Sequence, residues 1–244
     1  MIKKVAQLGF YVGDDYFERY SEGDEFPQVA AFKLEKRFLD ALRIGGAEVV
    51  TVASIAVSTY PRNKRIVFPG GSFIDKAGNE GRITPLINLP VLKVFVRLLG
   101  SLFGLIRHKK AGFDAVCVYA AHTPNLLAAY LVRKLYDVPF FVYIPDLPSY
   151  MDMGIKRSSL MRALKKFDAR IIDFLISASS GVLVISRHMV GDNKVWANKD
   201  FFVLEGIADS EEVSLSGKSE VQVWFKLTPA IKVGDAKLPV NANN

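Results

Sequence analysis

Apolar and polar positions along the chain form short apolar runs separated by longer amphipathic stretches. Runs that suit buried strands lie at 3–12, 47–54, 64–71, 112–120, 138–145, 181–186 and 201–206. Between them, apolar residues recur with a helical period at 28–46, 87–110, 122–136 and 158–179. The stretch 13–27 is polar and acidic, and we expect a loop there. Alternating strands and helices predict an α/β fold with a single Rossmann-like, doubly wound, mostly parallel sheet.

Signals at the ends of the expected helices support this division of the chain. Gly45 and Gly46 close the first helix, as glycines commonly do at helix C-termini. Thr123 is a natural N-cap, and Pro124 suits the first helical position. We expect the Rossmann-like domain to cover 1–208. Residues 209–244 have no helical pattern and at most one strand or hairpin, so we expect an irregular tail there.

Four residues lie at or just after the carboxyl ends of expected strands: Gly13, His122, Asp146 and Glu205. Parallel sheets bind ligands in the crevice beyond the carboxyl ends of their strands. The apolar strand 138–145 is followed by Asp146, a carboxylate between Pro145 and Pro148. We expect its side chain to face this crevice. We therefore expect these residues to share one edge of the sheet.

His122 has a second feature, because it precedes a helix whose free N–H groups can hold an anion. The positive helix end favours the neutral imidazole, which can accept a proton or a hydrogen bond. A histidine that merely caps or packs is an equally good interpretation of the same pattern.

The helix at 87–110 has an unusual pattern, since Lys93, Arg97, Ser101 and His108 form one narrow polar stripe on an otherwise apolar helix. Its apolar length approaches the roughly 20 residues that span a bilayer, but each central charge costs about 3 kcal/mol there. The helix therefore lies either in a membrane interface or half-buried in the domain. For the first case we expect five cations to face an anionic membrane: Lys93, Arg97, Arg107, Lys109 and Lys110.

Composition narrows the choice of partners. Half of the 244 residues are hydrophobic and the net charge is +7, which predicts a folded protein with an anionic neighbour. The single cysteine, Cys117, lies in an apolar run, and the N-terminus has no signal-peptide pattern, so we expect a cytoplasmic protein. Basic residues cluster at 156–170 without a nucleic-acid module, and we expect no nucleic-acid partner.

Several motifs are absent from the sequence. The first turn lacks G-x-G-x-x-G, and there is no P-loop, no G-x-S-x-G elbow and no D-x-D. The three histidines and the cysteine lack metal-ligand spacing. We therefore expect no cofactor and no metal.

The segments "AHTPNLLAAYL", "IPDLPSYM" and "VLEGIAD", each after a strand, resemble the N-terminal domain of family 4 glycosyltransferases of the GT-B fold. "FPQVAAFKLEKRFLDAL" and "TPLINLPVLKVFVR" resemble a bacterial branch that makes exopolysaccharide or other surface glycans. The resemblance covers roughly 3–209.

The resemblance implies a retaining, metal-independent transfer of sugar from a nucleotide-sugar to an acceptor, often lipid-linked. It places His122 at the family's active-site histidine and Asp146 at a polar contact to the acceptor. Gly13 and Asp14 match a loop that closes on the donor, although the family's paired glycines are missing. Glu205 and Gly206 match the interdomain segment, with Glu205 in place of an asparagine. The protein would work in the cytoplasm, peripherally on the inner membrane face.

The family's second, nucleotide-sugar-binding domain does not follow. Glu212 and Glu220 have the family's E-x7-E spacing, but no sheet pattern precedes them. We expect a truncated or frameshifted frame, or a donor domain on a separate chain, and little transfer by this chain alone. The alternative is a non-catalytic module that binds a membrane surface or a partner. Nucleic-acid binding, motivated by charge alone, is a third possibility.

Overall fold

The structure, a computed structural model, describes residues 2–110, 112–146, 159–191, 196 and 199–204. The expected tail at 209–244 and the predicted site residues Glu205 and Gly206 lie outside this range.

The sequence pattern forms one large sheet of eight strands in the order β10-β9-β8-β7-β1-β2-β5-β4. Neighbouring strands pair in parallel except β4 and β5. Two short strands, β3 and β6, form a separate antiparallel pair. The strands are β1 (Lys4–Gly9), β2 (Glu48–Ala53), β3 (Val67–Phe68), β4 (Gly71–Ile74), β5 (Glu80–Ile83), β6 (Leu86–Ile87), β7 (Ala115–Tyr119), β8 (Phe140–Ile144), β9 (Gly181–Val184) and β10 (Phe201–Val203). The predicted mostly parallel α/β sheet is confirmed.

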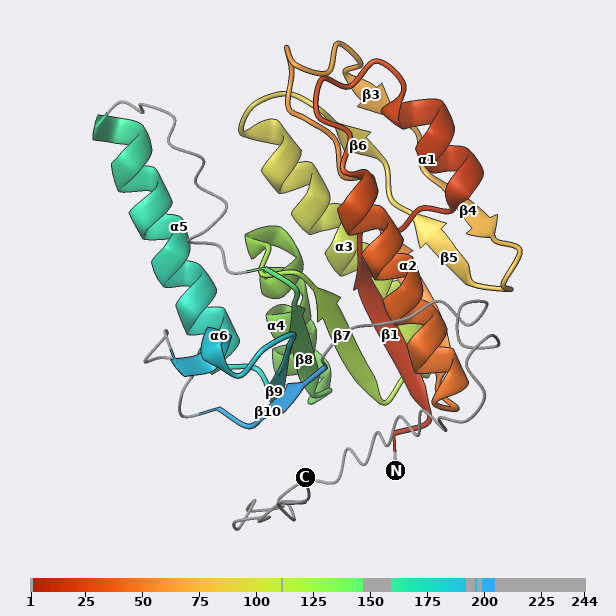
Figure 1. The fold of residues 1–244 in the computed structure, drawn as a ribbon, viewed down its shortest axis with the longest axis vertical. Helices are drawn as coiled ribbons and strands as arrows, with labels where there is room; N and C mark the ends of the chain where they lie inside the picture. The colour runs from red at the N-terminus through yellow and green to blue at the C-terminus, as the bar shows by residue number, and fades with distance from the viewer. Residues whose placement is uncertain (1, 111, 147–158, 192–195, 197–198, 205–244) are drawn as a thin grey trace, which may run out of the picture.

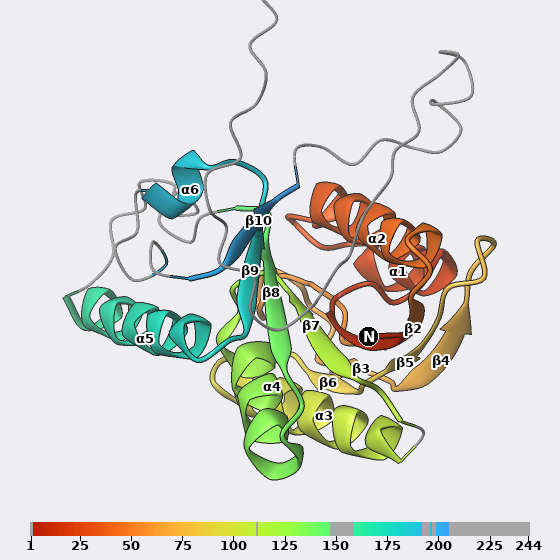
Figure 2. The same cartoon turned by 90° about the horizontal axis from the view of Figure 1, so that it is seen from below.

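Helices cover both faces of this sheet. They are α1 (Asp14–Ser21), α2 (Val29–Ile44), α3 (Leu92–Lys109), α4 (Thr123–Tyr136), α5 (Ser159–Ser177) and α6 (His188–Gly191). Figures 1 and 2 show α3, α4 and α5 together on one face, with α1 and α2 on the other. A change of helix side at β1 follows from right-handed crossovers that run in opposite directions from that strand.

Three local expectations were wrong. The strand expected at 64–71 is reduced to β3, which pairs with β6 outside the large sheet. The acidic stretch expected as a loop contains α1, whose N-cap is Gly13 and whose first turn carries Asp14 and Asp15. Carboxylates there interact favourably with the positive helix end. The N-cap of α4 is His122 and not Thr123, and the helix begins one residue earlier than its capping signal indicated.

Helix α3 packs on the sheet through small residues. A Cβ atom on Gly104 would lie 2.5 Å from Cγ1 of Val52, and one on Gly100 would lie 2.9 Å from Cβ of Thr84. Val52 is fully buried in β2 and cannot yield easily. The two glycines therefore let the helix axis approach the sheet closely.

Replacing Gly104 with alanine tests this close approach. We expect Gly104→Ala to lower the free energy of unfolding by about 1–2 kcal/mol, because overpacking outweighs the gain in helix propensity. Urea denaturation measures the change. Gly71→Ala is the control, since a Cβ there meets no atom within 4 Å. Equal stability of the two variants would contradict the packing argument.

Glu35 of α2 is a buried carboxylate, with 1% of its surface exposed. Its two oxygens accept the backbone N–H of Phe10 at 2.9 and 3.0 Å, and Oε1 also accepts Nε2 of Gln7. Burial raises the pKa of Glu35 to about 7, although these hydrogen bonds oppose the rise. The carboxylate thus fixes the backbone where the chain leaves β1.

A raised carboxyl pKa makes stability depend on pH. The folded state binds the extra proton between the ordinary pKa of 4.5 and about 7, so the free energy of unfolding should fall as pH rises through this window, by about 3 kcal/mol. Glu35→Gln should remove most of that slope, measured by urea unfolding at pH 5 and pH 7. Replacement of the exposed Glu22 with glutamine is the control. If the pH dependence of the unfolding free energy persisted in Glu35→Gln, other titrating groups would be its cause.

Candidate functional site

The predicted site residues His122 and Asp146 follow two neighbouring strands. Tyr119 of β7 pairs with Tyr143 of β8, and each site residue comes three positions later. Both therefore lie at the carboxyl edge of the sheet. Asp146 is exposed, and its charge helps to raise the pKa of Tyr143, after the larger effect of burial, to about 12.

A tight turn positions His122 at the start of α4. Ala120 has a φ of 65°, in the left-handed region that non-glycine residues rarely adopt, and its carbonyl accepts the N–H of His122 at 2.9 Å. The histidine keeps part of its surface exposed, but its Nδ1 is buried and has no hydrogen-bond partner. Strained backbone beside an unsatisfied buried nitrogen is typical of functional sites.

Arg97 of α3 reaches into this site from the neighbouring helix. Its Nε donates to Oγ of Ser54 and its Nη2 to the carbonyl of Ile55, both at 2.7 Å. Its Nη1 lies 3.4 Å from Nε2 of His122. The guanidinium carbon lies 5.1 Å from the centre of the Phe10 ring, which also makes an edge contact with His122 at 5.2 Å. These contacts bring together the ends of β1, β2 and β7.

Burial and neighbouring charges set the protonation of the site. Burial, followed by the charges of Arg97 and Lys93, lowers the pKa of His122 well below its usual 6.5. Burial lowers the pKa of Arg97 to about 10, and burial with the charge of Arg97 lowers that of Lys93 to about 8. At neutral pH the site therefore contains a neutral imidazole beside charged Arg97.

Lys93 and Arg97, which were expected to face a membrane, point into the protein instead. They are 9% and 5% exposed, and Nζ of Lys93 donates to the carbonyl of Val57 and to Oγ1 of Thr59. The polar stripe of α3 turns inward because the loop after β2 offers oxygens that satisfy it. The stripe's Ser101 continues this pattern, since it donates to Oδ1 of Asn125 on α4 at 3.0 Å.

The outward side of α3 is consequently apolar. Val94, Phe95, Leu99 and Phe103 are half or more exposed, and we call these four residues the outer face of α3. At the end of the helix Arg107 and Lys110 are exposed, whereas Lys109 is half-buried and donates to the carbonyl of Phe113 at 3.1 Å.

Gly13 and Asp14, the other predicted site residues that the structure describes, contact different residues. Gly13 is buried, and a Cβ there would meet the side chain of Phe73 in β4 at 3.0 Å. The carboxylate of Asp14 forms an ion pair with Lys36 of α2 at 2.5 Å. No contact in the described part of the chain joins these two residues to His122.

Sequence reasoning missed Phe10 and Glu35. Phe10 carries no signal, because one aromatic residue within the apolar run 3–12 is unremarkable. Glu35 did leave one: it lies on the face of α2 that also presents Phe32, Phe38, Leu39 and Leu42, all buried. A carboxylate within an apolar helix face requires a buried partner.

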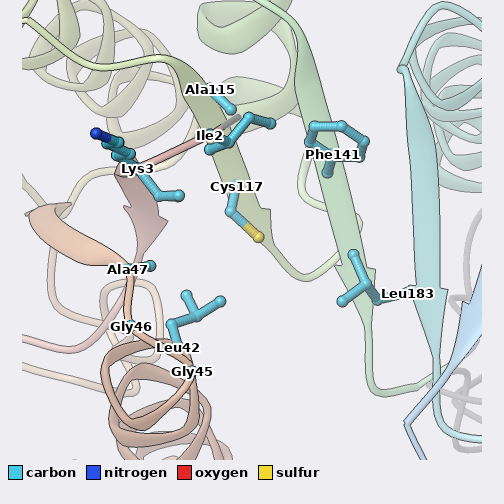
Figure 3. A pocket seen from close by; sticks show the side chains of 11 residues that line it. Ile2, Lys3, Leu42, Gly45, Gly46, Ala47, Ala115, Cys117, Phe141 and Leu183 are labelled. Carbon is cyan, nitrogen blue, oxygen red and sulfur yellow. The ribbon is translucent and has the colours of Figure 1, made fainter. Parts of the chain in front are cut away.

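A pocket of about 170 Å³ lies at the opposite end of the sheet, among the amino ends of the strands (Figure 3). Its lining is mainly apolar and includes Leu42, Cys117, Phe141 and Leu183. Burial raises the pKa of the Cys117 thiol to about 12, so the thiol stays protonated and poorly nucleophilic. This pocket holds none of the predicted site residues.

Among the residues that the structure describes, no three or more histidine, cysteine, aspartate or glutamate side chains cluster as metal ligands would. In the same part of the chain, no helix is both long and apolar enough to cross a membrane.

Comparison with known proteins gives a likeness of fold. No family model and no curated protein matches the sequence. Sucrose-phosphate synthase from Thermosynechococcus elongatus has a similar solved structure, with a TM-score of 0.50 and 12% identity, over 82% of this chain and 47% of the synthase chain. A second structure of that synthase gives a TM-score of 0.49 and 12% identity, over 87% of this chain and 94% of that one.

The fold is glycosyltransferase-like. It corresponds to one Rossmann-like half of the GT-B architecture, and this chain spans about half the length of the first synthase structure. The likeness is one of fold, and a shared fold does not identify a substrate.

Proposed function

We propose that this chain is the acceptor-side half of a retaining family 4 glycosyltransferase that acts on a lipid-linked acceptor in surface polysaccharide synthesis. Three observations support the proposal: the glycosyltransferase-like fold, the motif resemblance at His122 and Asp146, and the position of both residues at the carboxyl edge of the sheet.

The observation that carries the membrane part of the proposal is the outer face of α3. Phe95 and Phe103 are 57% and 63% exposed, while Lys93 and Arg97 of the same helix are buried. A contiguous exposed apolar face marks an interaction surface, and Arg107 and Lys110 beside it suit an anionic one.

Helix α5 offers a second surface of the same kind. Residues 161–170 are exposed throughout, and Met161, Leu164 and Phe167 form an apolar stripe flanked by Arg162, Lys166 and Arg170. Oγ1 of Thr123 donates to Asp168 at 2.6 Å and ties α5 to the start of α4. In Figure 1 the first turns of α3 and α5 both rise past the strand tips. Helices of this composition bind anionic lipid, and a lipid surface here would lie close to His122.

The proposed reaction also needs a nucleotide-sugar. The bond from the anomeric carbon to the phosphate oxygen breaks, a bond to an acceptor hydroxyl oxygen forms, the hydroxyl proton passes to a base, and the nucleotide diphosphate leaves. Holding donor and acceptor in attack geometry contributes about 7–11 kcal/mol in favourable cases. Under this proposal a donor-binding domain outside the described residues supplies the nucleotide-sugar, and neither metal nor cofactor takes part.

Introducing negative charge on the outer face of α3 tests membrane docking. The double variant Phe95→Glu with Phe103→Glu should lower sedimentation with phosphatidylserine-rich vesicles about tenfold or more, because two aromatic side chains lose their apolar contact and two negative charges are added.

The matched control is Ile44→Glu with Ile74→Glu, two exposed apolar residues that are 70% and 78% exposed on α2 and β4. It makes the same change in charge elsewhere on the protein. A similar loss of vesicle binding in both variants would show that the effect comes from the change in net charge alone. Unchanged sedimentation of the α3 variant would refute docking through this face.

Transfer of radiolabelled sugar tests the catalytic part. We expect little turnover from the purified chain and substantial turnover when a donor-binding domain protein is supplied, and His122→Ala should lower that activity about 100-fold, because a preorganised polar group of the site is lost. Robust turnover by the chain alone would refute the need for a second domain.

A non-catalytic membrane-surface module is the second candidate, because the outer face of α3 and the apolar stripe of α5 support it equally well. This second function would be favoured if vesicle binding depended on the outer face of α3 and no sugar were transferred with any donor-binding domain protein that was added.

A further inference from the structure

The contact between Arg97 and His122 determines which ring nitrogen carries the proton. Nη1 of Arg97 lies 3.4 Å from Nε2 of His122. A guanidinium group has only donors and stays charged in proteins. Nε2 must therefore present its lone pair to Arg97.

We propose that Arg97 is a positioning residue that holds His122 as the neutral tautomer with its proton on Nδ1, so that Arg97 occupies the lone pair of Nε2 and His122 does not serve as a base through that nitrogen. The unpartnered nitrogen, Nδ1, is then an N–H group at the start of α4. The tautomer of a histidine follows from the hydrogen bond that its other nitrogen makes.

The position of Arg97 does not depend on His122. Ser54 and the carbonyl of Ile55 fix the guanidinium at 2.7 Å each, and Phe10 packs against both the guanidinium and the imidazole. A ring flip would place a carbon opposite Nη1 and lose the only hydrogen bond that the imidazole makes in the described part of the chain.

The charges around the ring act in the same direction. Arg97 and Lys93 of α3 are the charged groups that influence His122, both are positive, and together with burial they lower its pKa well below 6.5. Full protonation would put a third positive charge among them.

The consequence for the site rests on the proposed function. If the chain binds a sugar acceptor, His122 cannot take the acceptor's proton through Nε2, because Arg97 occupies that lone pair. The base of the transfer is then another group.

Nitrogen-15 NMR of the full chain tests the proposal directly. The imidazole of His122 is assigned by its loss in His122→Gln, which separates it from His108 and His188. A hydrogen bond from a charged donor is worth about 1.5–3 kcal/mol, so the Nδ1–H tautomer should exceed the other about tenfold or more. It should remain neutral from pH 8 to pH 6. A predominant Nε2–H tautomer, or a ring protonated above pH 6, would overturn the proposal.

Arg97→Met should move the population toward the Nε2–H tautomer and raise the pKa of His122, whereas the control Arg107→Met, an exposed arginine on the same helix, should change neither. An unchanged tautomer in folded Arg97→Met would also overturn the proposal. If that variant does not fold, the wild-type spectrum decides alone. The measurement uses no sugar donor or acceptor, so a failure of the transferase assignment would leave its outcome intact.

Discussion

The buried guanidinium of Arg97 is the contact on which the architecture of the site depends. A buried charge costs several kcal/mol unless polar atoms surround it. Here the compensation comes from the hydroxyl of Ser54, the carbonyl of Ile55, the lone pair of His122 and the face of Phe10. No carboxylate in the described residues bonds to it. The charge is therefore stabilised only when the ends of three strands are in their native positions, and it couples the loops of the candidate site to one another.

Glu35 acts on the same site from the other face of the sheet. It accepts the N–H of Phe10 and so fixes the backbone that carries the ring against Arg97 and His122. The carboxylate of Glu35 and the guanidinium of Arg97 hold opposite ends of this one residue, backbone and ring. Two buried ionisable groups that do not form an ion pair thus define a single loop. Such arrangements favour precise geometry over maximal stability, as binding sites commonly do.

The inward turn of its polar stripe gives α3 a second role. Lys93, Arg97 and Ser101 bind the loop after β2 and helix α4, while Gly100 and Gly104 let the helix lie close to the sheet. Phe95 and Phe103 remain outside as a result. One helix thereby links the floor of the candidate site to the apolar surface that we propose for lipid. If α3 were rotated by half a turn about its axis, its polar stripe would face outward and could not hold the site, and Phe95 and Phe103 would be buried.

The sequence alone determined the alternation of strands and helices and the edge that His122 and Asp146 share, because period and strand ends are local properties. It also indicated a polar stripe on α3 but could not say which way the stripe faces. That choice depends on Ser54, Ile55 and Val57, which are distant in sequence and close only after the sheet forms. Likewise, α1 was missed because its stability comes from tertiary contacts that no local pattern encodes. Phe17 packs against Phe32 of α2, Tyr20 packs against Phe68 of β3, and Asp14 pairs with Lys36.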